Sequence, residues 1–182
     1  MERQIEGSIV YAGKLFQVYR DRVRLREGQE VTREVVRHPG SVAIVPRDGQ
    51  GRVVLVRQFR YPVGRELWEV PAGTCDHPGE SLHETAQREL AEEAGLKAGR
   101  MLFLGRAYLA PGWADELMNF FLAEDLSPTE GHSEFDESFA VNPFDLHDLR
   151  VLRSTGEMED AKTLIGLAWI GLDIWREAGS RN

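Results

Sequence analysis

The chain has 182 residues, with 22 Lys and Arg against 30 Asp and Glu and a formal net charge of −8 at pH 7. This length fits one domain, and 42% hydrophobic with 29% charged residues is typical of an ordinary globular protein, which excludes a disordered or fibrous chain. The acidic balance argues against binding a nucleic-acid backbone or an anionic membrane surface. We therefore expect no nucleic-acid partner and no membrane partner.

Cys75 is the only cysteine, which excludes intramolecular disulfides and thiolate metal clusters and fits a reducing compartment. The first residues, MERQIEGSIVYAGK, lack the apolar run of a signal peptide. No stretch of about 18 or more apolar residues could span a membrane. These features predict a cytoplasmic protein.

The N-terminal residues alternate between apolar and polar side chains. This alternation runs from Leu15 to Leu25 and again from Glu34 to Arg37, which predicts a small antiparallel β-sheet within residues 1–40. A second β unit begins near Ser41, where two apolar strands are joined around the turn signal Asp48-Gly49.

The spacing of apolar residues becomes helical in the middle of the chain and predicts a helix from Ser81 to Leu96. Ser81 and Glu84 fit a capping box at its start, and Gly95 fits the residue that ends it. Further strands are expected at residues 101–109, 117–123 and 138–141. Apolar residues three and four apart from Ala161 to Trp175 predict a long amphipathic helix. Because strands and helices mix without a regular alternation, we predict an α+β fold with a mixed sheet.

Three glutamates crowd one side of the predicted central helix. Glu89 and Glu93 are four residues apart and Glu92 lies beside them, so their charges repel unless solvent or a cation neutralises them. Such a cluster is commonly only a solvated surface. Here, however, the segment Val70 to Gly73 ends a strand and brings backbone carbonyls near the helix. Carboxylate and carbonyl oxygens suit Mg²⁺ or Mn²⁺, whose natural partner in such sites is a phosphate ester or anhydride.

The segment from Gly73 to Leu96 resembles the Nudix box, in which Gly, five residues, Glu and seven residues precede Arg-Glu-U-x-Glu-Glu-x-Gly-U, with U aliphatic. Every fixed position from Glu80 onward matches, whereas six residues, not five, separate Gly73 from Glu80. The resemblance implies a Nudix-type α/β/α sandwich with a mixed sheet. It also implies divalent-metal-dependent hydrolysis of a nucleoside diphosphate linked to another moiety.

Flanking segments resemble the ADP-ribose pyrophosphatase branch of that family: Val56 to Pro62, Leu67 to Gly73, and Pro111-Gly112 with Glu116. Members of that branch cut ADP-ribose to AMP and ribose 5-phosphate and act as homodimers that exchange their N-terminal sheets. The resemblance thus implies a dimerising segment at residues 1–40 and a catalytic domain at residues 41–182.

The resemblance also implies roles for the residues of the box. Metal ligands would be the Ala72 carbonyl, Glu89 and Glu93, with Glu92 as an adjacent ligand or supporting carboxylate. The structural positions of the motif are Gly73, Glu80, Arg88 and Gly95. From spacing alone, Arg88 can pair with either Glu84 or Glu80.

The catalytic base is expected in an acidic loop after the box, which in the branch carries Glu-x-Glu before an aliphatic strand. Here the loop reads Glu134-Phe135-Asp136-Glu137. Glu137 takes the position of a further metal ligand, and Phe135 falls where the base would be. Glu134, Asp136 and Glu137 itself remain alternatives for the base.

Substrate-binding residues are implied outside the box. Arg60 matches an Arg that contacts phosphate in the family, and Arg33 or Arg37 could reach a partner subunit's site. The alternative for such arginines is a surface ion pair. The remaining candidates are two acidic residues of the flanking motifs and three aromatic residues that could stack on adenine but are more often part of a core: Glu69, Glu116, Phe16, Tyr19 and Trp113.

Three hypotheses follow. The first is a Mg²⁺-dependent ADP-ribose pyrophosphatase, with Mn²⁺ as the other candidate ion. The second keeps this chemistry for another nucleotide sugar such as GDP-mannose, because base and sugar selectivity depends on residues outside the motif. The third is a Nudix module that senses ADP-ribose without cleaving it.

Overall fold

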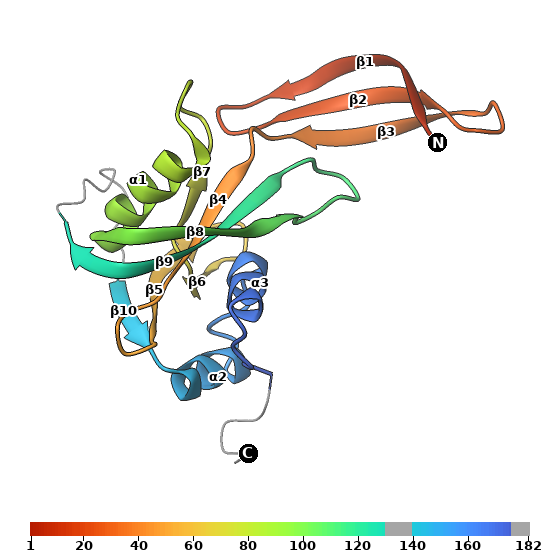
Figure 1. The fold of residues 1–182 in the computed structure, drawn as a ribbon. Coiled ribbons are helices and arrows are strands. Elements are labelled where there is room, and N and C mark those ends of the chain that lie inside the picture. Colours follow the sequence, from red (N-terminus) through yellow and green to blue (C-terminus); the bar gives the residue numbers. More distant parts are fainter. Residues whose placement is uncertain (130–139, 176–182) are drawn as a thin grey trace. The chain divides into compact units, whose positions relative to one another are not determined.

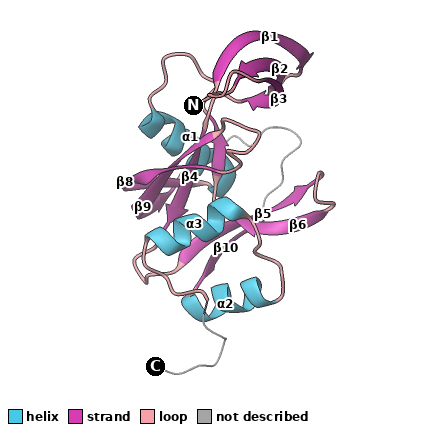
Figure 2. Ribbon diagram, turned by 90° about the vertical axis from the view of Figure 1, so that its right-hand side faces the viewer, coloured by secondary structure: helices cyan, strands magenta, loops and turns pink. Residues whose placement is uncertain are grey.

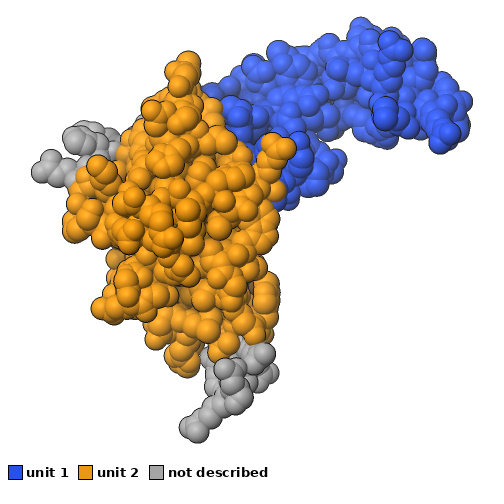
Figure 3. Space-filling view, viewed as in Figure 1, with its two compact units in different colours: residues 1–40, 107–118 blue, residues 41–106, 119–182 orange. Residues whose placement is uncertain are grey.

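The computed structural model describes residues 1–129 and 140–175 (Figure 1). Contacts divide the chain into two compact units, coloured separately in Figure 3. The first unit comprises residues 1–40 and 107–118, and the second comprises residues 41–106 and 119–182. Residues 107–118 thus pack with the N-terminal segment, although they lie within the range 41–182 that the sequence grouped together.

The described residues form ten strands and three helices. In chain order they are β1 (Arg3–Ala12), β2 (Gln17–Arg24), β3 (Glu30–Arg37), β4 (Ser41–Pro46), β5 (Val53–Arg60), β6 (Arg65–Glu69), β7 (Ala72–Thr74), α1 (Leu82–Ala94), β8 (Leu96–Tyr108), β9 (Leu117–Pro128), β10 (Ala140–Phe144), α2 (Leu146–Ser154) and α3 (Ala161–Trp169). None of these helices is long and apolar enough to cross a membrane.

The first unit contains the antiparallel sheet β1-β2-β3, which confirms the small sheet predicted within residues 1–40. Cross-strand ion pairs join its polar face, for example Arg20 with Glu34 at 3.1 Å and Arg22 with Glu6 at 2.9 Å. Every residue of β1 is exposed. Within one chain β1 is therefore held by its pairing with β2 and by surface charge pairs, without burial of its own side chains.

The second unit is built around β4, all of whose residues are buried. Val42 and Ile44 belong to the same apolar cluster as Leu90 of α1. Val45 points the other way and lies against Gly166 of α3, where an added Cβ would stand 2.7 Å from the Val45 side chain. Because alternate residues of a strand face opposite sides, the sheet β7-β4-β9-β8 lies between α1 and α3, as Figures 1 and 2 show.

A second antiparallel sheet, β10-β5-β6, completes this unit. The α+β class and the α/β/α sandwich with a mixed sheet are confirmed. The predicted helix at Ser81 to Leu96 is also confirmed as α1, between the N-cap Ser81 and the C-cap Gly95.

Two features near the C-terminus differ from the sequence prediction. The long helix predicted to reach Trp175 ends at Trp169, because Gly171 adopts φ 81° and the Leu172 N–H donates to the Leu167 carbonyl at 3.1 Å, a Schellman ending. Helix α2 was not predicted, although Asp145 and Asp148 form a capping box at its start.

Candidate active site

The start of α1 is fixed by hydrogen bonds that the sequence predicted. The Glu84 N–H donates to the Ser81 side chain at 3.3 Å, and the Ser81 N–H donates to the Glu84 carboxylate at 2.8 Å. At the other end, Gly95 takes the left-handed conformation with φ 64°. The helix that carries the acidic face is thus held at both ends by local sequence.

The loop between Gly73 and Glu80, which is one residue longer than in the Nudix box, contains a tight turn just before Glu80. The Glu80 N–H donates to the His77 carbonyl at 3.2 Å, with Pro78 and Gly79 at the central positions and Gly79 at φ 86°. Pro followed by a residue with positive φ is the signature of a type II turn. The turn returns Glu80 to the side of the helix despite the longer loop.

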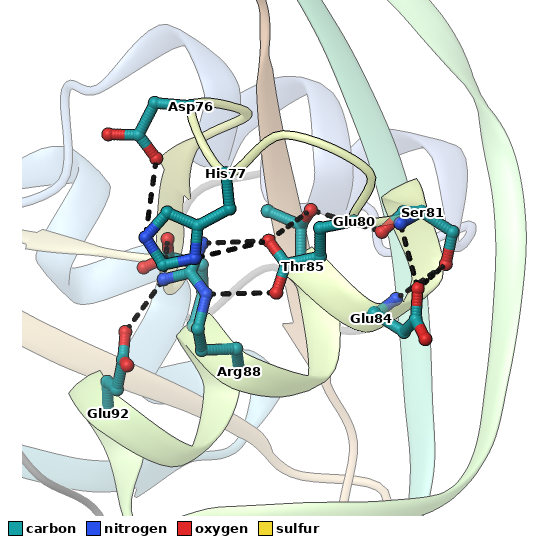
Figure 4. A network of polar contacts seen from close by, with 9 residues as sticks. Asp76, His77, Glu80, Ser81, Glu84, Thr85, Arg88 and Glu92 are labelled. Carbon is teal, nitrogen blue, oxygen red and sulfur yellow. Dashed lines mark hydrogen bonds and ion pairs between the residues drawn. The ribbon is translucent and has the colours of Figure 1, made fainter.

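Arg88 connects the carboxylates of the box (Figure 4). Its Nε and Nη2 donate to the two oxygens of Glu80 at 3.1 and 3.2 Å, and its Nη1 donates to Glu89 at 2.7 Å and to Glu92 at 2.9 Å. The Thr85 hydroxyl donates to the same Glu80 at 3.0 Å. Of the two partners that spacing allowed for Arg88, the structure thus has Glu80. Hydrogen bonds from Arg88 hold the pKa of Glu80 below its usual value.

Glu89 is the buried carboxylate of this group, with 9% of its surface exposed. Burial raises its pKa; Arg88 opposes the shift, whereas Glu92 and Asp76 add to it. The carboxylate lies directly against Gly73, where a Cβ would stand well inside the 3.0 Å limit that real Cβ contacts respect. Glycine is therefore required at position 73 so that Glu89 can approach the β7 backbone.

Glu93 lies on the same side of α1 and accepts a hydrogen bond from the Ala72 N–H at 3.0 Å. Glu89 and Glu93 are thus both placed against the start of β7, next to the predicted carbonyl ligand. Within the described ranges 1–129 and 140–175, no three His, Cys, Asp or Glu side chains are grouped so that they could hold an ion by themselves. Mg²⁺ commonly takes few carboxylates and completes its shell with water and phosphate oxygens, so these hard oxygen donors fit such an ion.

A second charged cluster stands where β5 and β6 face the start of α3. Glu69 is 1% exposed and accepts from Arg60 Nε at 2.9 Å and from Arg60 Nη2 at 2.6 Å. Lys162 of α3 donates to Glu69 Oε2, which also accepts from Arg60 Nη2, and the Lys162 ammonium lies 3.0 Å from the Asp160 carboxylate. Burial alone would raise the pKa of Glu69, but Arg60 and Lys162 outweigh it and lower that pKa. This cluster is close enough to the acidic helix for the charge of Glu93 to act on Arg60.

A cavity of about 420 Å³ is lined by residues of this cluster and of the β5–β6 turn. Its lining includes Arg60, Glu69, Asp160, Lys162, Pro62 and Val63. Sequence reasoning identified Arg60 and Glu69 but missed Lys162 and Asp160. A signal was present, because Lys162 is a charged residue beside the apolar stripe of the last predicted helix, two positions after an Asp suited to cap it.

The substrate candidates of the first unit are placed apart from one another. Arg33 pairs on the surface with Glu2 at 2.6 Å, whereas Arg37 pairs with Asp115 at 3.0 Å and lies over the Tyr19 ring at 5.8 Å. Arg33 thus takes the surface-pair alternative within one chain, whereas Arg37 also donates to the buried Asp21 at 3.4 Å. Arg37 also lines a cavity of about 310 Å³ together with Phe16.

The other described candidates, Trp113 and Glu116, also belong to the first unit. Trp113 is 60% exposed. The three acidic residues considered for the base, Glu134, Asp136 and Glu137, lie outside the described residues.

Known proteins resemble this chain over most of its length. The NUDIX domain family model matches residues 37–165. An ADP-ribose pyrophosphatase of Bacillus subtilis is 37% identical over 173 residues, which cover 94% of this chain and 93% of that protein. An ADP-ribose pyrophosphatase of Mycobacterium tuberculosis is 41% identical over 167 residues, covering 90% and 80% respectively.

Solved structures share the fold as well. The crystal structure of an ADP compounds hydrolase matches with a TM-score of 0.82 at 24% identity, over 93% of this chain and 91% of that one. The matched domain agrees with the acidic face of α1, with the carboxylates bound by Arg88 and with the glycine that lies against Glu89. The chain belongs to the Nudix family.

Proposed function

We propose that this protein is an ADP-ribose pyrophosphatase that hydrolyses ADP-ribose to AMP and ribose 5-phosphate. One observation carries the proposal: two carboxylates of α1, Glu89 and Glu93, are placed against the backbone of β7, where Arg88 donates to Glu89 and the Ala72 N–H donates to Glu93. The similarity to two ADP-ribose pyrophosphatases over about nine tenths of the chain supports this choice of substrate.

Glu89, Glu93 and the Ala72 carbonyl would hold the divalent cation, with Glu92 beside them and Glu137 as a further ligand. Mg²⁺ is the first candidate ion and Mn²⁺ the second, since both prefer oxygen ligands. When bound, such an ion neutralises phosphate charge and lowers the pKa of a coordinated water.

The remaining work falls to side chains of this chain. Arg60 binds a phosphate oxygen, for which a guanidinium is well suited. One carboxylate among Glu134, Asp136 and Glu137 takes the proton of the attacking water. That water forms a bond to phosphorus in line with the bridging oxygen, and the bond from phosphorus to the bridging oxygen breaks.

We further propose that the cavity lined by Phe16 and Arg37 receives the adenine ring, by stacking and by cation–π contact. Arg33 and Arg37 would serve the site of a second subunit in a homodimer that exchanges residues 1–40. The full exposure of β1 supports this, because a thin sheet with an uncovered apolar face is marginal by itself. Exposed apolar residues on that segment include Ile5, Ile9, Val10 and Tyr11. The single cysteine supports a cytoplasmic location.

The test is a hydrolysis assay with ADP-ribose, GDP-mannose and other nucleotide sugars, in Mg²⁺, in Mn²⁺ and in chelator. AMP formed from ADP-ribose with the highest kcat/KM, and only with metal, is the expected result. Faster turnover of GDP-mannose would move the substrate to the second hypothesis. Binding of ADP-ribose without cleavage would make the protein a sensor and refute the enzymatic proposal.

A further inference from the structure

We infer that Lys162 is a positioning residue that acts on substrate through Arg60, with Glu69 as the link between them. This inference rests on the proposed function, because it assigns Arg60 to the phosphates of the substrate. The three side chains come from three elements, α3, β6 and β5, so the contact exists only in the folded chain.

The burial of Lys162 needs an explanation. Only 7% of its side chain is exposed, whereas lysine is rarely buried unless it is paired. It also sits in the first turn of α3, where the helix dipole disfavours a positive charge. A buried ion pair of this kind is weak evidence for stability, because removing charges from water costs about as much as the pair returns. The position of Lys162 therefore points to a role in placing other groups.

The group that Lys162 places is the Glu69 carboxylate. Its oxygen Oε2 accepts from both Lys162 and Arg60 Nη2, while Oε1 accepts from Arg60 Nε. Asp160, the N-cap of α3, holds Lys162 at 3.0 Å and accepts from the Thr163 N–H at 2.9 Å. The orientation of the Glu69 carboxylate is thus fixed from two sides, by Arg60 and by Lys162, which is itself held at the N-terminus of α3.

The consequence for Arg60 is a fixed guanidinium. Glu69 engages its Nε and Nη2 as a fork, which sets the plane of the group and turns Nη1 away from the carboxylate. Arg60 keeps 37% of its side chain exposed and lines the 420 Å³ cavity beside Glu69 and Lys162. A phosphate that enters this cavity meets an Arg whose rotamer is already chosen, so less entropy is lost on binding.

The test is a double-mutant cycle of Lys162→Met and Arg60→Ala in the full-length protein, with ADP-ribose as substrate. Lys162→Met should raise KM about tenfold with kcat within about twofold, and should have no further effect on kcat/KM in the Arg60→Ala background. Lys162→Arg, which keeps the charge, should restore KM to within about twofold of the unmodified protein. Lys97→Met is the matched control, since Lys97 is an exposed lysine on β8.

Two results would overturn the inference. The first is a loss of kcat/KM in Lys162→Met that multiplies with the loss in Arg60→Ala, so that the two residues act independently. The second is a lowered melting temperature of Lys162→Met with KM unchanged, which marks a purely structural lysine. If Lys162→Met does not fold, Lys162→Gln, which keeps one donor for Glu69, replaces it in the same cycle. Failure of the proposed function is separately visible, because the unmodified protein would then not hydrolyse ADP-ribose.

Discussion

Replacement of Gly73 by alanine adds one methyl group at the point where β7 meets the acidic helix. A Cβ at position 73 would overlap all three atoms of the Glu89 carboxylate, closer than the 3.0 Å that real Cβ atoms respect. The obstructing atoms are the far end of a flexible side chain, so the carboxylate can move aside. Since overpacking a core costs about 1–3 kcal/mol, the loss of stability should lie near the lower end of that range.

Activity should suffer far more than stability. Glu89 is a proposed metal ligand, and moving its carboxylate away from β7 separates it from Glu93 and from the Ala72 carbonyl. We expect Gly73→Ala to lower kcat/KM for ADP-ribose by about 100-fold or more, comparable to the loss of one electrostatic contact to a transition state. Urea unfolding and the metal-dependent hydrolysis assay measure the two quantities on the same preparation.

Gly49→Ala is the control for this experiment, because a Cβ at position 49 meets nothing within 4 Å. It should leave both kcat/KM and the free energy of unfolding nearly unchanged. Full activity of Gly73→Ala would refute the reasoning, since Glu89 would then not need its place against β7. A protein that fails to fold would show that the backbone, and not Glu89, is forced to move.

Four further predictions concern the same unit. Glu93→Gln should abolish hydrolysis with folding nearly intact, and retention of activity would contradict its assignment as a metal ligand. Burial raises the pKa of Glu89, so the contribution of this group to stability is present below its unfolded pKa and is lost as pH rises through the folded pKa. Without metal, Glu89→Gln should therefore have a higher melting temperature than the unmodified protein at pH 7. An equal or lower melting temperature would count against the raised pKa. Arg60 and Lys162 lower the pKa of Glu69, so the contribution of Glu69 to stability is present above its unfolded pKa and is lost as pH falls through the folded pKa. Glu69→Gln should therefore weaken the fall in the free energy of unfolding at acidic pH. Ser81→Ala removes the N-cap of α1 and should cost about 1 kcal/mol in urea unfolding, against no measurable change for the exposed Ser8→Ala on β1.

Local sequence determined the elements whose signals lie within a few residues. Ser81, Glu84 and Gly95 specified both ends of α1, because caps and left-handed endings depend on neighbouring backbone groups. Helical spacing also specified that Glu89 and Glu93 share one side of that helix. Pro78-Gly79 carried the turn that absorbs the additional loop residue, although the path of that loop was not predicted.

Other features were decided by contacts between distant segments. Spacing left Arg88 with two possible partners, and only the folded loop brought Glu80 to it. The sequence predicted Gly73 as a motif position, while the reason for glycine there is the approach of Glu89 from another element. Residues 107–118 pack with the first unit, although no change of composition along the chain sets them apart from the residues around them.

By itself, the sequence determined the family motif, the α+β class and the acidic face of α1, since each depends on a periodicity or a spacing along the chain. Only the tertiary structure decided that Lys162, Glu69 and Arg60 share one buried contact. These residues are up to 102 positions apart in number, from 60 to 162, and although Lys162 stands beside an apolar stripe, nothing near it in the sequence identifies Glu69 and Arg60 as its partners. The physical reason is burial: a carboxylate withdrawn from water requires cationic partners, and the fold alone chooses which cations reach it.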